Sequence, residues 1–219
     1  MLKITAKGKN AEILLYDDIG EGMFGGISAK AFISELNKAG NLNNIDIRIN
    51  SAGGDVFEGV AIYNALIRNS ARVVTHVDGL AASIASIIAM AGDSIHIADN
   101  AMMMIHDPWT FAMGSAVELR KQADTLDKVR DTLIGTYVNR TGLSTNEVSG
   151  LMTAETWMDA KEAVSRGFAD TVFEPMPMAA SIKIKKYNYR HMPERFVPRE
   201  TSNNNEYRDK ITKLANRKI

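Results

Sequence analysis

The feature that most constrains the fold of this chain is a repeated order of strand, glycine-containing turn and helix. Residues 45–49 alternate apolar and polar side chains as a strand does, two glycines follow, and apolar residues then recur at helical spacing up to Ile67. The same order occurs in residues 11–39 and again in residues 72–91. Strands that alternate with helices pair in parallel through right-handed crossovers. The sequence therefore predicts an α/β fold with helices packed outside a parallel sheet.

The predicted elements are as follows. Strands are expected at residues 11–16, 45–49, 72–77, 94–97, 102–105 and 169–173. Helices are expected at residues 28–39, 56–67, 81–91, 115–139, 144–152 and 160–166. A turn at Gly79 separates the third strand from its helix. The helix at residues 115–139 is amphipathic and long enough to project from the core.

Bulk composition excludes several classes of protein. The 219 residues carry 26 Lys and Arg against 26 Asp and Glu, so the chain lacks the overall positive charge of nucleic-acid-binding domains. The absence of cysteine excludes disulfides, thiolate catalysis and cysteine-ligated zinc. No apolar run approaches the ~20 residues of a membrane span, and the first residues do not resemble a signal peptide. We expect one catalytic domain in the cytoplasm that needs no metal and no bound cofactor.

The character of the sequence changes after about residue 173. Apolar periodicity fades, and from residue 181 onward eleven Lys and Arg stand against four Asp and Glu, a local net charge of about +7. We expect a domain over residues 1–173 and a basic, flexible extension over residues 174–219. This extension is either a solvated tail or a tether for an acidic partner or an assembly contact.

Ser83 follows a predicted strand and a glycine turn, at the start of a helix rich in small residues. Backbone N–H groups in the first turn of a helix lack intrahelical partners, so the N–H of Ile84 can stabilise an oxyanion beside the serine hydroxyl. The two glycines after residue 52 can expose N–H groups in a similar way, and Gly54 is the second candidate donor. Taken alone, each motif is also typical of ordinary helix packing or of a tight turn.

His106 ends an apolar strand before a turn, where its imidazole can reach a cleft. A neutral imidazole with a pKa near 6.5 is suited to take the proton of a serine. An acid must then orient the ring, and Glu155 is the leading candidate, with Asp159 second. Asp107 is third, because neighbouring side chains on an extended segment point to opposite sides.

Four segments of the chain, in this order, resemble the ClpP family of serine peptidases, and particularly the ClpP-related proteases encoded beside phage capsid genes. They are Ile49-Asn50-Ser51-Ala52-Gly53-Gly54, Gly79-Leu80-Ala81-Ala82-Ser83, Met104-Ile105-His106-Asp107-Pro108 and Glu155-Thr156-Trp157, the last followed by residues 161–170. The resemblance covers about residues 13–173. It implies Ser83 as nucleophile, His106 as general base and Glu155 at the position of the family's usual aspartate. It also implies that Gly54 and Ile84 supply the oxyanion-hole N–H groups.

The resemblance further implies the ClpP/crotonase-type fold of repeated ββα units, with the helix at residues 115–139 as a handle between stacked rings of subunits. The expected activity is hydrolysis of polypeptides through an acyl-enzyme, specifically of capsid or scaffold proteins during phage head maturation. One alternative is a housekeeping peptidase subunit that works with a Clp ATPase, although the first ten residues have no clear counterpart to the N-terminal loop of such subunits. The others are a crotonase-type acyl-CoA enzyme and a ring-forming structural homologue with an incomplete triad.

Overall fold

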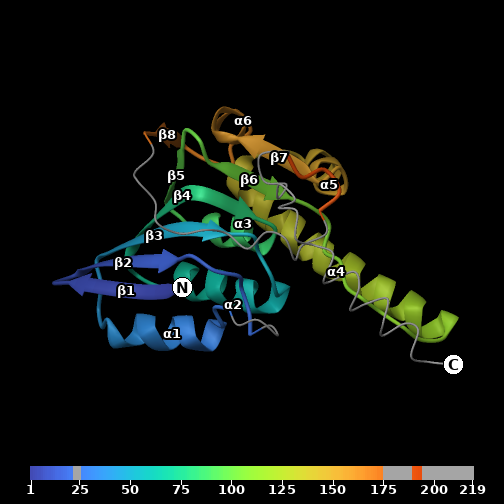
Figure 1. Cartoon of the computed structure of the whole chain (residues 1–219), viewed down its shortest axis with the longest axis horizontal. Helices are drawn as coiled ribbons and strands as arrows, with labels where there is room; N and C mark the ends of the chain where they lie inside the picture. Colours follow the sequence, from blue (N-terminus) through green and yellow to red (C-terminus); the bar gives the residue numbers. More distant parts are fainter. Residues whose placement is uncertain (22–25, 175–188, 194–219) are drawn as a thin grey trace, which may run out of the picture.

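The computed structural model of the chain describes residues 1–21, 26–174 and 189–193. Within these residues, eight strands form one sheet, and six helices accompany it (Figure 1). The strands are β1 (Leu2–Lys7), β2 (Asn10–Leu15), β3 (Asn44–Ser51), β4 (Arg72–Ala82), β5 (Ser94–Ala98), β6 (Met102–Ile105), β7 (Thr156–Asp159) and β8 (Thr171–Phe173). The helices are α1 (Ala29–Lys38), α2 (Val56–Ile67), α3 (Ile84–Ala89), α4 (Ala116–Thr141), α5 (Thr145–Thr153) and α6 (Ala160–Ser165).

The order of strands in the sheet is β1-β2-β3-β4-β5-β8, and β6 pairs with β4 beyond the segment that pairs with β5. Neighbours from β2 to β5, the pair β4–β6 and the pair β5–β8 are parallel, as the alternation of strands and helices predicts. Strands β1 and β7 were not predicted, and each pairs antiparallel, β1 with β2 and β7 with β6. The predicted α/β class is confirmed, with a mixed sheet rather than a wholly parallel one.

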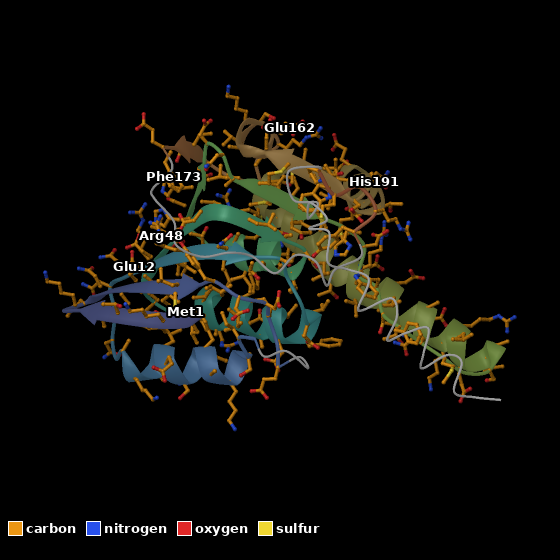
Figure 2. The ribbon with its side chains drawn as sticks, viewed as in Figure 1. Met1, Glu12, Arg48, Glu162, Phe173 and His191 are labelled. Carbon is orange, nitrogen blue, oxygen red and sulfur yellow. The ribbon has the colours of Figure 1, made fainter. Side chains whose placement is uncertain are left out.

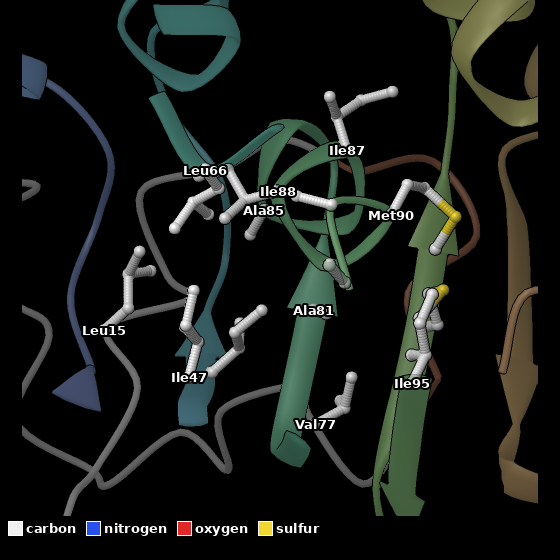
Figure 3. Packing of buried hydrophobic residues seen from close by; sticks show 14 of the residues in the cluster. Leu15, Ile47, Leu66, Val77, Ala81, Ala85, Ile87, Ile88, Met90 and Ile95 are labelled. Carbon is white, nitrogen blue, oxygen red and sulfur yellow. The ribbon is translucent and has the colours of Figure 1, made fainter. Parts of the chain in front are cut away.

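The central strands have one apolar and one polar face, because side chains alternate along a strand. Ile47 of β3 and Val77 of β4 are fully buried in the same cluster as Ile88 of α3 (Figure 3). The opposite face carries Arg48, which forms an ion pair with Asp78 at 2.5 Å. This alternation places the helices against one face of the sheet.

Helices α4 and α5 begin where the sequence predicts, because a capping box fixes the N-terminus of each helix. Ser115 and Ser144 accept hydrogen bonds from the backbone N–H groups of Glu118 and Glu147, whose carboxylates return to the capping residues. The buried residues of α4 all lie near its C-terminal end, and the first turns extend away from the body of the molecule (Figure 1). The prediction of a long projecting helix is therefore confirmed.

The expectation that β4 ends at a turn around Gly79 is wrong. The pairing of Ile49 with Val77 is followed by that of Ser51 with Ala81, so β4 advances four residues while β3 advances two. Gly79 lies in this irregular stretch, where an extra length of chain is accommodated without ending the strand. As a result α3 begins at Ile84 rather than at residue 81.

No helix among the described residues is both long enough and apolar enough to cross a membrane. Most of the extension expected over residues 174–219 lies outside the described residues, with the exception of residues 174 and 189–193.

Phe32 should anchor α1 to the sheet, because it is fully buried on the inner side of that helix. We expect Phe32→Ala to lower the free energy of unfolding by about 3–5 kcal/mol, since it leaves a cavity in the core. Urea denaturation followed by circular dichroism measures this change. Lys30→Ala, on the exposed side of the same helix, is the control and should keep the wild-type midpoint. An unchanged midpoint in Phe32→Ala would contradict the anchoring role.

Candidate active site

Ser83 lies directly between the end of β4 and the start of α3. Its N–H donates to the carbonyl of Met104 at 2.9 Å, which continues the pairing of β4 with β6 by one residue. Its backbone has φ of +54° and ψ of −131°, a conformation that residues with side chains rarely adopt. A strained turn between a strand and a helix is an arrangement that exposes a serine hydroxyl to substrate. The local backbone is therefore suited to a nucleophile.

The turn after β3 packs so closely on Ser83 that only glycine fits at residue 53. A Cβ atom at Gly53 would lie 2.7 Å from the Cβ of Ser83 and 2.8 Å from the carbonyl oxygen of Ala82. Gly53 also has φ of +97°, which disfavours any side chain. The glycine pair recognised in the sequence thus lets a second stretch of backbone approach the hydroxyl.

His106 follows the last residue of β6, and its Nε2 atom lies 2.8 Å from the Oγ of Ser83. Burial lowers the pKa of His106, although the negative charges of Glu155 and Asp107 oppose this shift. The ring is therefore neutral at pH 7 and can accept the serine proton at Nε2. The structure brings together the serine and the histidine that the sequence singles out.

Glu155 lies in the short connection between α5 and β7, beside the end of β6. The antiparallel β6–β7 register pairs Ile105 with Thr156. His106 follows Ile105 and Glu155 precedes Thr156, so the two residues are adjacent across the strands. Among the described residues, no hydrogen bond joins the Glu155 carboxylate to the His106 ring, and their interaction is electrostatic. Like Ser83, Glu155 has a positive φ, here +50°.

The Glu155 carboxylate accepts three other hydrogen bonds. Its Oε2 accepts from the backbone N–H of Arg190 at 2.8 Å, and its Oε1 accepts from that of His191 at 2.7 Å and from the Trp157 indole at 3.2 Å. Burial raises the pKa of Glu155, but these donors outweigh it and leave the pKa below its ordinary value. The carboxylate is ionised at neutral pH.

The two other candidate acids have structural roles elsewhere. Asp159 pairs with Met102 in the β6–β7 ladder, which places it about 13 Å along the sheet from the position of His106. Its side chain caps α6 by accepting from the N–H of Glu162, so the structure does not bring it to the site. Asp107 forms an ion pair with Arg130 at 2.5 Å, which holds its carboxylate away from the imidazole.

Of the two predicted oxyanion donors, Ile84 follows Ser83 in the chain, and Gly54 follows Gly53, which packs on Ser83. Ile84 is the first residue of α3, so its N–H belongs to the helix terminus that lacks an intrahelical acceptor. On the other side, Ile19 bonds to the carbonyl of Gly53 and to the N–H of Asp55, which flank Gly54. In this parallel bridge the hydrogen bonds to Ile19 are made by the residues on either side of Gly54. The N–H of Gly54 itself therefore points away from Ile19.

Several residues around the site were not found from the sequence. The hydroxyl of Ser86 donates to the carbonyl of Ser83 at 2.6 Å and lies 2.8 Å from the hydroxyl of Tyr137 on α4, and this chain of contacts supports the strained turn. The spacing of Ser83 and Ser86 by three residues was the available signal. Trp157 is part of the Glu155-Thr156-Trp157 motif, although no role was predicted for its side chain, whereas Tyr189 lies in the segment expected to be a flexible extension.

A cavity of about 330 Å³ opens beside His106 and Glu155. Its lining includes His106, Trp109, Glu155, Tyr189 and Arg190. Within the described part of the chain, no three His, Asp or Glu side chains are grouped so as to hold a metal ion.

Similarity to known proteins identifies the family of this chain. The family model of the Clp protease matches residues 4–176. The ATP-dependent Clp protease proteolytic subunit 1 of Protochlamydia amoebophila (strain UWE25) is 33% identical over 164 residues, which represent 73% of this chain and 79% of that relative. The mixed α/β sheet with its helices is consistent with the ClpP fold. The chain thus belongs to the Clp protease family and is a serine-type endopeptidase of the ClpP type.

Proposed function

We propose that Ser83 is the nucleophile, His106 the general base and Glu155 the acid of the peptidase. The observation that carries this proposal is the 2.8 Å contact between Ser83 Oγ and His106 Nε2 at a strained strand-to-helix turn. Ser83 attacks the scissile carbonyl while His106 takes its proton, and the N–H groups of Gly54 and Ile84 stabilise the oxyanion. His106 then protonates the leaving amine, and water hydrolyses the acyl-enzyme by the same steps. The negative charge of Glu155 stabilises the imidazolium that forms in each half-reaction.

Assembly into homo-oligomeric rings, with stacking through α4, is part of the proposal. The loop before α4 and its first turn expose large apolar side chains, namely Trp109, Phe111, Met113, Val117 and Leu119. Apolar residues gathered on one exposed segment are typical of a surface that another subunit covers. This segment therefore supports self-association.

For the natural substrates we propose capsid or scaffold proteins cleaved in the host cytoplasm during phage head maturation, because the active-site motifs resemble those of phage-encoded relatives. The name of the Protochlamydia relative supports the alternative, a proteolytic subunit that acts with a Clp ATPase. The two roles differ in their genetic setting. Neighbouring portal and capsid genes favour head maturation, and a neighbouring Clp ATPase gene favours the alternative.

Ser83→Ala should reduce kcat for a fluorogenic peptide by at least about 10⁴-fold, because no other group replaces the nucleophile. It should also abolish covalent labelling by a serine-directed phosphonate, measured by intact mass. Gel filtration of the variant should match that of the wild type, since the substitution removes one oxygen atom. Persistent labelling would contradict the assignment of Ser83.

Glu155→Ala should lower kcat by about 10²–10⁴-fold, because the imidazolium loses its counter-charge. Glu155→Asp keeps the charge and should retain more activity than the alanine variant. Asp159→Asn is the matched control, because asparagine also caps a helix, and it should keep wild-type kcat. Steady-state kinetics on one peptide substrate measures all three. A Glu155→Ala variant with wild-type kcat would exclude Glu155 from the triad.

The acid limb of the pH dependence of kcat/KM should lie below pH 6.5, the ordinary pKa of histidine, since burial lowers the pKa of His106. The charge of Glu155 raises that pKa, so Glu155→Gln should move the limb to still lower pH. The positive charge of Arg190, by contrast, lowers the pKa of His106. Hydrolysis rates measured from pH 4 to 8 test the direction of the shift. Movement of the limb to higher pH would contradict the electrostatic contact.

A further inference from the structure

A segment of the chain itself, residues 189–193, packs against His106, and two of its residues, Tyr189 and Arg190, line the cavity beside that histidine. The Tyr189 ring lies edge-on to the His106 ring, with centroids 5.5 Å apart and planes at 82°. It makes a similar contact with Trp157, at 5.5 Å and 83°. Figure 2 places the neighbouring His191 beside α5 and β7, the elements that flank Glu155. An aromatic side chain of the segment therefore fills space directly against the histidine.

The polar contacts of this segment have the character of peptide binding. The hydroxyl of Tyr189 donates to the carbonyl of Ala52, in the turn that precedes Gly54. The peptide N–H groups of Arg190 and His191 donate to the two oxygens of Glu155, at 2.8 and 2.7 Å. Every residue except proline has such an N–H group, so these two contacts, made where the segment bends, recognise the backbone rather than particular side chains.

The apolar contacts lie on a separate cluster of the sheet, distinct from the main core. This cluster, called here the apolar subsite, consists of Ala52, Leu80, Ala82, Met102 and Met104, with Trp157 at its margin. Tyr189 and Met192 pack on it from the segment. Burial raises the pKa of the Tyr189 phenol above its ordinary value, and the negative charges of Glu155 and Asp18 raise it as well. The hydroxyl therefore keeps its proton. A mostly apolar surface with a few polar groups is typical of a ligand-binding cleft.

We infer that residues 189–193 are an internal ligand of the peptide-binding cleft, which competes with polypeptide substrates and holds the Glu155 carboxylate on its own backbone. The inference rests on the proposed peptidase function, because it takes the cleft as the place where substrate binds. A tethered ligand acts at an effective concentration of about 1 mM, so modest affinity is enough to keep the cleft filled. Segment and substrate are both polypeptides, so a substrate can offer Glu155 the same kind of backbone N–H donor.

Displacement of the segment has two separate effects on catalysis. It opens the apolar subsite to substrate, which lowers the apparent KM. It also frees the two oxygens of Glu155 from the N–H groups of Arg190 and His191, so the carboxylate can turn to His106 and raise kcat. The internal ligand is thus a restraint on both substrate binding and the chemical step.

Two full-length variants should release the segment. Tyr189→Ala removes the ring that packs on His106 and Trp157. Arg190→Pro removes the N–H donor to Glu155, and Arg190→Ala is its matched reference, because it loses the same side chain but keeps the N–H. With a tether at about 1 mM and an intrinsic Kd on the order of 0.1 mM, release should raise kcat/KM about tenfold.

Kinetics with a fluorogenic peptide and the rate of phosphonate labelling measure the release. We expect Tyr189→Ala and Arg190→Pro to exceed the wild type in both rates, and Arg190→Pro to exceed Arg190→Ala. If Ser83 is labelled at the same rate in the wild type and in the Tyr189→Ala, Arg190→Pro and Arg190→Ala variants, the internal ligand is excluded while the peptidase function stands.

A binding measurement separates the inference from catalysis. In the Ser83→Ala background, a fluorescein-labelled peptide of sequence Tyr-Arg-His-Met-Pro should bind the Arg190→Pro chain about tenfold more tightly than the Arg190→Ala chain, measured by fluorescence anisotropy. This result would support the internal ligand even if the nucleophile assignment failed. Equal affinity, or no binding to either chain, would overturn it. Loss of the segment from the purified wild-type chain, detected by intact mass, would also overturn it, because the segment would then be a substrate.

Discussion

Strand β4 pairs with β5 along its first half and with β6 along its second half, and this change of partner sets the distance between the serine and the histidine. The hydrogen bond from Ser83 to Met104 holds the strained turn level with the end of β6. The free edge of β6 then pairs with β7, which brings Glu155 to the far side of His106. Three residues distant in sequence are thus placed by neighbouring strands of one rigid sheet, which suits chemistry that tolerates little misplacement.

Backbone strain coincides with the site. Among the described residues, Ser83 and Glu155 are the two non-glycine residues with positive φ. Such conformations cost about 1–3 kcal/mol each, and they persist where surrounding contacts over-determine them. At Ser83 these contacts are the hydrogen bonds to Met104 and Ser86. At Glu155 the backbone N–H donates to the carbonyl of Met152. The positions that conflict most with local preference are therefore the ones that carry the proposed chemistry.

Much of the fold follows from local patterns in the sequence, because alternation, helical spacing and capping residues act over a few neighbours. The limits of α2, α4 and α5 were predicted closely for this reason. The continuation of β4 past Gly79 depends on a register shift against β3, which is a property of two strands and not of one. Strand β7 is four residues long and is defined by its pairing with β6, so it had no periodic pattern of its own.

The same distinction between local and long-range contacts applies to the site. Ser83 and His106 were identified from motifs, because each lies at the end of a strand that the sequence reveals. The order of preference for the acid, with Glu155 before Asp159, rested on alignment of the motif, and the structure gives Asp159 a helix-capping role instead. Tyr189 could not have been placed from the sequence, because its contacts join segments more than 30 residues apart and follow no periodic pattern.

Helix α4 lies in the chain between the paired strands β6 and β7, yet its first turns extend away from the sheet (Figure 1). The register between those strands, and with it the placement of His106 beside Glu155, depends on the ladder and not on the length of the intervening helix. Whole turns can therefore be gained or lost at the outer end of α4 during evolution while the catalytic geometry stays fixed. In the proposed assembly, the spacing between subunits and the chemistry inside each subunit can in this way diverge independently.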